Sequence, residues 1–270
     1  MNSRRHSTRL HEQEEIVYCR SKERTEKDNL MKRAITFDYW QTLVDDTRER
    51  ETMTARKKMM HKYLIAIGFK PPENLDAGFA TAKPWFHAIY HGEQRTPTLE
   101  ERLEFVLNHY GIKLATTQLK PLAHEFGELG LMLGPVPTPN VAETLALLSK
   151  TYPLGIVSDT GYTPGSVLRR HLEHHGLLQY FSAFSFSNES GRAKPHEHAF
   201  MTALNQVGAE PANAIHCGDL PAHDVLGAKR LGMTAVLYTG CWASETDGII
   251  PDYVIADWRE LPAIVEKVFA

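Results

Sequence analysis

The sequence predicts an α/β protein in which a doubly wound, Rossmann-like parallel sheet carries an inserted all-helical domain. Short, mostly apolar segments recur along the chain, and segments of helical length separate them. This alternation is typical of buried parallel strands joined by helices. Residues 46–138 interrupt it and contain helical patterns only. Right-handed crossovers would build one sheet with ligands at the carboxyl ends of its strands.

Six apolar segments are the predicted strands of this sheet. They are residues 34–37, 153–157, 183–186, 214–217, 234–238 and 253–255. Each is mostly apolar on both faces, as expected where helices cover both sides of a sheet. Two of the intervening helices are readily recognised. Residues 139–150 place Val141, Leu145 and Leu148 on one face, and residues 195–207 have proline in the first turn.

The helical insert is predicted to contain four helices. They are residues 54–67, 79–90, 99–110 and 118–132, separated by Gly68, Gly92, Pro97 and Gly111. A stiff, proline-rich stretch at residues 134–139 ends the insert. We therefore divide the chain into a core of residues 31–45 and 139–270 and an insert of residues 46–138. Trp85, Phe86 and Tyr90 are expected in the core of the insert, with one or two at a substrate entrance.

Residues 1–30 differ in composition from the rest of the chain. They combine seven Lys/Arg with six Asp/Glu, contain few aliphatic residues and show no stable period, which predicts a solvated, mobile tail. The change at Met31 also suggests the hypothesis that translation begins there. The intact mass of the native protein tests this, and a mass that includes residues 1–30 would end the idea.

Composition excludes several classes of protein. A hydrophobic content of 42% and a charged content of 23% are ordinary for a folded domain, and a net charge of -3 gives no basic field for nucleic acid. No run of about eighteen apolar residues predicts a membrane span, and no apolar signal segment follows the N-terminal arginines. Cys19, Cys217 and Cys241 are odd in number and show no zinc-type spacing, so a cytoplasmic setting is expected. The oligomeric state stays open.

Polar side chains follow the first four predicted strands along the chain. Because parallel strands end at the same edge of a sheet, these side chains should converge. The set is Asp38 and Thr42 after the first strand, Ser158 after the second, Lys194 beyond the third, and Asp219 with Asp224 after the fourth. The sequence therefore predicts a site that combines carboxylates, hydroxyls and one ammonium group.

The same residues resemble the four motifs of the haloacid dehalogenase superfamily. Residues 37–43 (Phe-Asp-Tyr-Trp-Gln-Thr-Leu) are similar to its first motif and residues 156–158 (Ile-Val-Ser) to its second. Residues 193–195 (Ala-Lys-Pro) resemble the third, and residues 217–219 (Cys-Gly-Asp) with Asp224 resemble the fourth. Their order and spacing match from Met31 to the C-terminus, and the insert occupies the place of the family's helical cap.

The resemblance implies a phosphatase for a small phosphorylated molecule, with Mg²⁺ as cofactor. Asp38 would attack phosphorus and form an aspartyl-phosphate, which splits one hard displacement into two easier ones. Asp38 and Asp219 would hold Mg²⁺ against the substrate's negative charge, with the backbone carbonyl of Trp40 as a further ligand. Asp224 would hold either the metal shell or Lys194 in place.

The remaining motif residues would contact the phosphoryl group. Thr42 and Ser158 can hydrogen-bond to its oxygens, and Lys194 can neutralise both the attacking carboxylate and the transferring group. Several of these residues also have simpler structural interpretations. Ser158, Asp159 and Thr160 could cap a helix that begins near Thr163, and Asp219 with Asp224 could be turn or N-cap residues.

Trp40 departs from the phosphatase pattern. Most phosphatases of the superfamily have a second aspartate at this position, where it protonates the leaving group and activates the hydrolytic water. General acid-base assistance is worth about 10² to 10⁴ in rate, or roughly 3 to 5 kcal/mol. Leaving groups that depart without a proton, such as an acyl phosphate or a phenolate, should suffer least. Asp45, Asp46 or His223 are candidates for the missing acid.

Two other functions remain open. The rival enzyme is a 2-haloacid dehalogenase, which has an aromatic residue at the position of Trp40 and uses no metal. Gly218 and Asp219 oppose it, because such dehalogenases usually have Ser-Asn there. The third reading is a phosphate-ligand sensor or partner-binding module that keeps Mg²⁺ without turnover. Outside the site, His171, His174 and His175 are expected on a solvated helix face and Cys217 as a buried, inert thiol.

Overall fold

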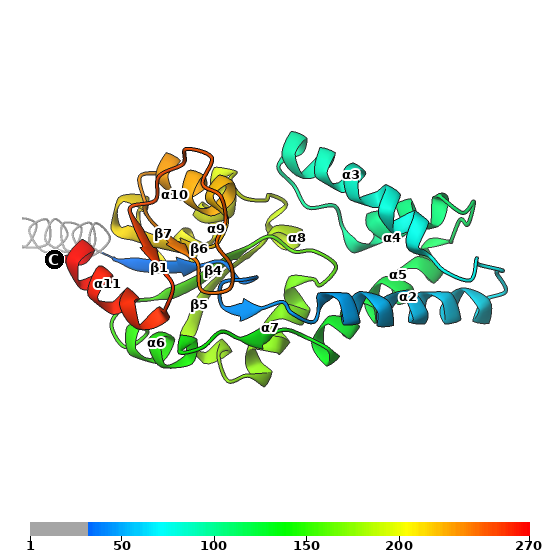
Figure 1. Cartoon of the computed structure of the whole chain (residues 1–270), viewed down its shortest axis with the longest axis horizontal. Helices are drawn as coiled ribbons and strands as arrows, with labels where there is room; N and C mark the ends of the chain where they lie inside the picture. Colours follow the sequence, from blue (N-terminus) through cyan, green and yellow to red (C-terminus); the bar gives the residue numbers. More distant parts are fainter. Residues whose placement is uncertain (1–31) are drawn as a thin grey trace, which may run out of the picture.

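The computed structural model describes residues 32–270, so both the predicted tail and the hypothesis about Met31 lie outside the described residues. A six-stranded parallel sheet forms the centre of the fold, in the order β5-β4-β1-β6-β7-β8 (Figure 1). In chain order this is 3-2-1-4-5-6, the arrangement of doubly wound sheets. Its strands are β1 (Ala34–Phe37), β4 (Leu154–Ser158), β5 (Phe181–Phe186), β6 (Ala214–Gly218), β7 (Thr234–Tyr238) and β8 (Tyr253–Ile255).

Alternate residues of the strands face two different clusters of buried side chains. In β1, Ile35 and Phe37 face one cluster, whereas Ala34 faces the other. The first cluster packs under α6 (Val141–Leu148), α7 (Gly165–His174) and α11 (Leu261–Phe269). The second packs under α9 (Glu197–Val207) and α10 (Leu226–Arg230). Both faces of the sheet are therefore covered, which explains why the strands are apolar throughout.

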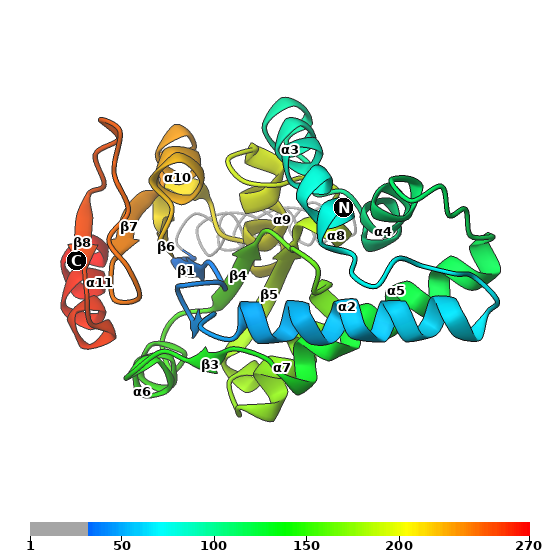
Figure 2. The same ribbon diagram turned by 45° about the vertical axis from the view of Figure 1, so that its right-hand side comes forward.

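The insert is a separate layer of helices beside the sheet (Figure 2). Its helices are α2 (Glu49–Ala66), α3 (Asp76–Glu93), α4 (Leu99–Asn108) and α5 (Thr116–Met132). They share a cluster of buried side chains of their own, which includes Leu64, Val106 and Phe126. α4 begins with a capping box, because Thr98 and Glu101 each accept a backbone N–H of the other.

A two-stranded antiparallel ribbon connects the sheet to the insert. β2 (Val44–Asp45) leads out and β3 (Val136–Pro137) leads back, with Val44 opposite Pro137. The proline-rich stretch that the sequence marks as a stiff boundary is therefore paired along part of its length. The chain leaves the sheet directly after β1, so this ribbon lies close to Asp38.

All six predicted strands are present, within two residues at each end. The predicted helices are present as well, but their ends move: α2 begins at Glu49, before the predicted start, and α9 begins at Glu197, after Pro195. The remaining short elements are η1 (Leu178–Tyr180), α8 (Ser187–Ser190), η2 (Pro211–Asn213), η3 (Pro221–Val225) and η4 (Trp258–Glu260). None of the helices within residues 32–270 combines the length and the apolar composition that a membrane-spanning helix needs.

Candidate active site

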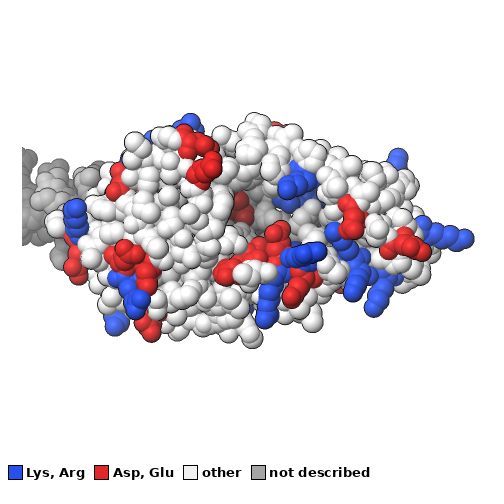
Figure 3. Space-filling model, in the orientation of Figure 1, with Lys and Arg blue, Asp and Glu red and all other residues white. Residues whose placement is uncertain are grey.

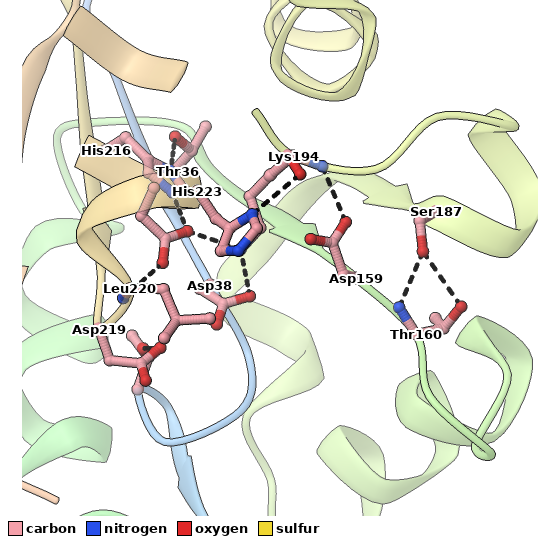
Figure 4. Close-up of polar contacts among 12 residues, drawn as sticks. Thr36, Asp38, Asp159, Thr160, Ser187, Lys194, His216, Asp219, Leu220 and His223 are labelled. Carbon is pink, nitrogen blue, oxygen red and sulfur yellow. Dashed lines mark hydrogen bonds and ion pairs between the residues drawn. The ribbon is translucent and has the colours of Figure 1, made fainter. Parts of the chain in front are cut away.

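Asp38, Lys194 and Asp219 lie close together at the carboxyl end of the sheet (Figure 4). β1 lies between β4 and β6, so Asp38, Ser158 and Asp219 extend from three neighbouring strands. The backbone N–H of Asp38 donates to the carbonyl of Cys217 at 2.8 Å, which fixes the two loops next to each other. The parallel topology therefore produces the convergence that the sequence predicts.

Lys194 connects two of the acids. Its Nζ lies 2.6 Å from Asp38 Oδ1 and 2.6 Å from Asp224 Oδ1, and all three side chains are buried. Burial lowers the pKa of Lys194, but Asp224 and Asp38 outweigh it and raise the pKa well above its usual value. The lysine is therefore a fixed positive charge that is directed at the candidate nucleophile.

A third buried carboxylate, Asp219, lies beside the two that are paired with this ammonium group. Ligand atoms of Asp38, Asp219 and Asp224 all lie within 4.8 Å of one another. Burial raises the pKa of Asp38, and burial with the neighbouring Asp38 and Asp224 raises the pKa of Asp219 to about 8. Three carboxylates face one lysine, so the cluster carries more negative charge than Lys194 balances once Asp219 is ionised. Closely spaced carboxylate oxygens with excess negative charge fit a hard divalent cation such as Mg²⁺.

Asp224 is held by an extensive hydrogen-bond network. His216 Nε2 lies 3.0 Å from Asp224 Oδ1, and the backbone N–H of Leu220 donates to Oδ2 at 2.9 Å. Burial raises the pKa of Asp224, but Lys194 and His216 outweigh it and hold the pKa below its usual range. Gly218 makes this close approach possible, because a Cβ there would lie 2.2 Å from Asp224 Cγ.

The two predicted hydroxyl groups have different environments. Thr42 Oγ1 donates to Asp219 Oδ1 at 3.3 Å, so it contacts the acidic cluster directly. Ser158 Oγ is buried and, among the described residues, has no hydrogen-bond partner. A buried hydroxyl without a partner costs free energy unless a ligand satisfies it. The Ser158 hydroxyl is therefore available for a hydrogen bond to a ligand.

A cavity of about 330 Å³ opens beside these groups, between the sheet and the insert. Its wall combines aromatic, acidic and basic side chains, among them Trp40, Asp46, Arg56, Phe86, Tyr90, Asp159, Tyr162 and His223. In the space-filling view the surface is hollowed at this junction, and acidic residues gather along the hollow (Figure 3).

The structure separates the three candidates for the missing acid. Asp46 and His223 line the cavity, whereas Asp45 does not. Burial, followed by the charge of Glu49, raises the pKa of Asp46 to about 7. Burial lowers the pKa of His223, whose Nδ1 lies 3.2 Å from the carbonyl of Lys194. Sequence alone gave no reason to separate Asp45 from Asp46.

Tyr90 brings the insert into contact with the core. Its hydroxyl donates to Asp159 Oδ2 and lies 3.3 Å from His223 Nδ1. The other oxygen of Asp159 accepts the backbone N–H of Lys194 at 3.0 Å. Burial raises the pKa of Asp159 to about 6. Tyr90 is therefore one of the insert residues at the entrance, while Trp85 instead stacks on Phe105.

The expected solvent exposure of His171 and the alternative of a helix cap at residues 158–160 are both wrong. His171 is buried rather than solvated: Tyr39 Oη lies 2.6 Å from its Nδ1, and its Nε2 lies 2.7 Å from the carbonyl of Pro135. Apolar periodicity gives no information on polar partners inside the core, so it could not predict that Tyr39 and the carbonyl of Pro135 lie beside His171. Nor do residues 158–160 cap a helix, because α7 has Pro164 at its N-cap and no side-chain cap. Cys217 is buried as expected, and burial raises the pKa of its thiol.

Three residues around the site carried no clear signal in the sequence. His216 lies within an apolar strand, where a single histidine has no diagnostic spacing. Asp159 directly follows Ser158, and its position in the sequence indicates only a possible helix cap. Trp242 lies in an irregular loop, where no period predicts the direction of a side chain, yet its indole N–H donates to Asp219 Oδ2 at 2.8 Å.

Parts of this chain are similar to known proteins. A family model described as haloacid dehalogenase-like hydrolase matches residues 83–238. Glyceraldehyde 3-phosphate phosphatase of Methanothermobacter thermautotrophicus is 34% identical over 104 residues, which are 37% of this chain and 44% of that protein. The chain spans about half the length of the curated relatives that it matches.

Solved structures agree over a longer range. The 2-haloacid dehalogenase from Pseudomonas syringae pv. Tomato DC3000 has a TM-score of 0.65 at 24% identity, covering 88% of this chain and 99% of that one. The HAD-hydrolase YfnB from Bacillus subtilis, bound to magnesium, has a TM-score of 0.59 at 18% identity, covering 87% and 99%. These identities show a shared fold alone. With a family model that matches more than half of its length, this chain belongs to the haloacid dehalogenase-like hydrolases.

Proposed function

We propose that this hydrolase is a Mg²⁺-dependent phosphatase that acts on a small phosphorylated metabolite through an aspartyl-phosphate on Asp38. The observation that carries the proposal is the buried cluster of three carboxylates around Lys194. A 2-haloacid dehalogenase attacks carbon without a metal ion, so an acidic metal ligand such as Asp219 would have no role in its reaction. A related protein that is named a phosphatase supports the same reading.

In this proposal Asp38 Oδ2 attacks the phosphorus atom, since Oδ1 is paired with Lys194 Nζ. Lys194 and the hydroxyl of Ser158 stabilise the phosphoryl oxygens as charge moves toward the leaving group. The leaving oxygen departs into the cavity next to Trp40. Water then attacks the aspartyl-phosphate, which releases phosphate and restores the carboxylate.

Asp38, Asp219 and the backbone carbonyl of Trp40 would hold Mg²⁺, with Asp224 as a further candidate ligand. When bound, the ion supplies positive charge that offsets the repulsion between Asp38 and an anionic substrate. Because Asp224 is also paired with Lys194 and His216, we assign it mainly to positioning Lys194.

Trp40 restricts the proposed substrates to those with good leaving groups. No carboxylate stands at its position, and its ring packs against Tyr39 with centroids 4.9 Å apart. Acyl phosphates and aryl phosphates leave without a proton, so they should react faster than alkyl phosphates. We propose no nucleic-acid or membrane partner, and a cytoplasmic setting that fits the free thiols of Cys217 and Cys241.

A 2-haloacid dehalogenase is the second candidate, and two observations favour it. Trp40 places an aromatic ring where those enzymes have one, and a dehalogenase has a similar fold. The third candidate is a module that binds Mg²⁺ and phosphate without turnover.

One assay separates these functions. The purified protein is incubated with acetyl phosphate, p-nitrophenyl phosphate, an alkyl phosphate and 2-chloropropionate, each with Mg²⁺ and with EDTA, beside Asp38→Asn. Mg²⁺-dependent release of phosphate from the activated esters, lost in Asp38→Asn, supports the phosphatase. Release of chloride in EDTA supports the dehalogenase. No turnover with retained binding of Mg²⁺ and phosphate supports the binding module.

A further inference from the structure

The loop between β7 and β8 contacts Asp219, one member of the acidic cluster. Trp242 Nε1 donates to Asp219 Oδ2 at 2.8 Å, and Ser244 Oγ donates to the backbone carbonyl of Asp219 at 2.6 Å. This loop therefore hydrogen-bonds to both the side chain and the backbone of Asp219, which is a candidate metal ligand. The motifs of the site do not include this loop.

Both oxygens of Asp219 are engaged, from different segments. Thr42 Oγ1 donates to Oδ1 at 3.3 Å, while Trp242 donates to Oδ2. A carboxylate held at both oxygens has little freedom to rotate, and an indole ring has only two side-chain torsions to lose. The orientation of Asp219 is therefore fixed before any ion binds.

The start of this loop is itself fixed against the sheet. The backbone N–H of Thr239 donates to the carbonyl of Ile255 at 2.8 Å. At the next residue, Gly240, a Cβ would lie 2.3 Å from Tyr238 Oη and 2.5 Å from the carbonyl of Ala256. Only glycine fits where the chain turns this closely, so the path that carries Trp242 toward Asp219 is well defined.

The exposure of Trp242 argues against a purely packing role. Its side chain is 45% exposed, whereas Asp219 is 3% exposed. A half-exposed indole gains only part of the free energy of burial, and its N–H would normally bind water. Here the N–H is instead directed to a buried carboxylate at the centre of the site.

We propose that Trp242 is a positioning residue for the divalent-cation site. The indole N–H of Trp242 occupies one lone pair of the Asp219 carboxylate and fixes its orientation, so that the remaining lone pairs are directed at the ion. Ser244 fixes the backbone of Asp219. Mg²⁺ requires near-ideal octahedral geometry, so a freely rotating ligand weakens its binding. This inference rests on the cation site of the proposed function, but not on which reaction the site performs.

The test is calorimetric titration of the full chain with MgCl₂ alone, without substrate. Trp242→Phe keeps an aromatic ring but removes the donor, and partners of metal ligands are typically worth 10–100-fold in affinity. We expect the Mg²⁺ dissociation constant to rise by about this factor. Trp85→Phe makes the same chemical change in the insert, where Trp85 stacks on Phe105 with centroids 4.5 Å apart. It should leave the dissociation constant unchanged.

Thermal unfolding in EDTA shows whether each variant is folded, and Ser244→Ala provides a second, milder removal of a donor. Folded Trp242→Phe that binds Mg²⁺ within twofold of the wild-type protein overturns the inference. Should Trp242→Phe fail to fold, unchanged binding by Ser244→Ala overturns it instead. Wild-type protein that binds no Mg²⁺ refutes the cation site of the proposed function, which is a separate outcome.

Discussion

Replacing Lys194 with methionine should strongly destabilise the metal-free protein. Methionine is similar in length but removes the ammonium group that Asp38 and Asp224 share at 2.6 Å each. The side chains of Lys194, Asp38 and Asp224 are only 3%, 6% and 1% exposed, so water cannot compensate for the lost positive charge. Breaking a buried ion pair in this way costs about 3–5 kcal/mol.

The loss is measurable as a shift in unfolding temperature. For a domain of this size, 1 kcal/mol corresponds to about 2–4 °C, so we expect a fall of about 6–20 °C in EDTA. Lys57→Met is the matched control. Lys57 Nζ also lies 2.6 Å from a carboxylate, that of Asp76, but these side chains are 28% and 68% exposed. An exposed pair is worth less than about 1 kcal/mol.

The same reasoning predicts what restores Lys194→Met. Mg²⁺ or a lower pH reduces the uncompensated negative charge, so either should raise the unfolding temperature of this variant more than that of the wild-type protein. The reasoning is refuted if, in EDTA, Lys194→Met unfolds no earlier than Lys57→Met. That result would mean that the buried carboxylates do not depend on the lysine for their charge balance.

Three further predictions follow from individual residues. Trp40→Asp should raise the turnover of alkyl phosphates by about 10² to 10⁴, because it restores a general acid for the leaving group. No gain in a folded variant would contradict the idea that Trp40 replaces such an acid. Burial raises the pKa of Asp219 from 3.8 to about 8, so the folded, metal-free protein binds a proton at Asp219 more tightly than the unfolded chain does. The free energy of unfolding gained from this proton is fully present below pH 3.8 and is lost as the pH rises through 8. Mg²⁺ must displace that proton, so its affinity should increase up to about pH 8, and a flat calorimetric profile on both sides of that pH contradicts this. His171→Phe should cost about 1–3 kcal/mol for each buried group left unpaired, measured by urea unfolding, whereas His174→Phe should cost little because His174 is exposed.

The sheet and the positions of the motif residues could be predicted because both depend on local pattern and parallel topology. An apolar run such as residues 34–37 predicts a buried strand, and parallel strands place Asp38 and Asp219 at one edge. Helix ends were less accurate. α2 has no side-chain cap at Arg48, so no residue there marks its start at Glu49.

Contacts between distant segments could not be predicted. His171 is buried because Tyr39 and the carbonyl of Pro135 lie beside it, and neither partner is near it in the sequence. Tyr90 reaches Asp159 only because the insert folds over the core. Trp242 likewise reaches Asp219 from an irregular loop. Each of these polar contacts depends on tertiary placement, about which hydrophobic periodicity gives no information.

The most direct test of the proposed function is whether Asp38 becomes phosphorylated. The protein is mixed with acetyl phosphate and Mg²⁺, quenched rapidly in acid, digested, and examined by mass spectrometry. We predict one added phosphoryl group on the peptide that contains Asp38, absent in EDTA and absent in Asp38→Asn. Turnover of acetyl phosphate without any phosphoryl group on this peptide, or with one attached to a different residue, would contradict the account.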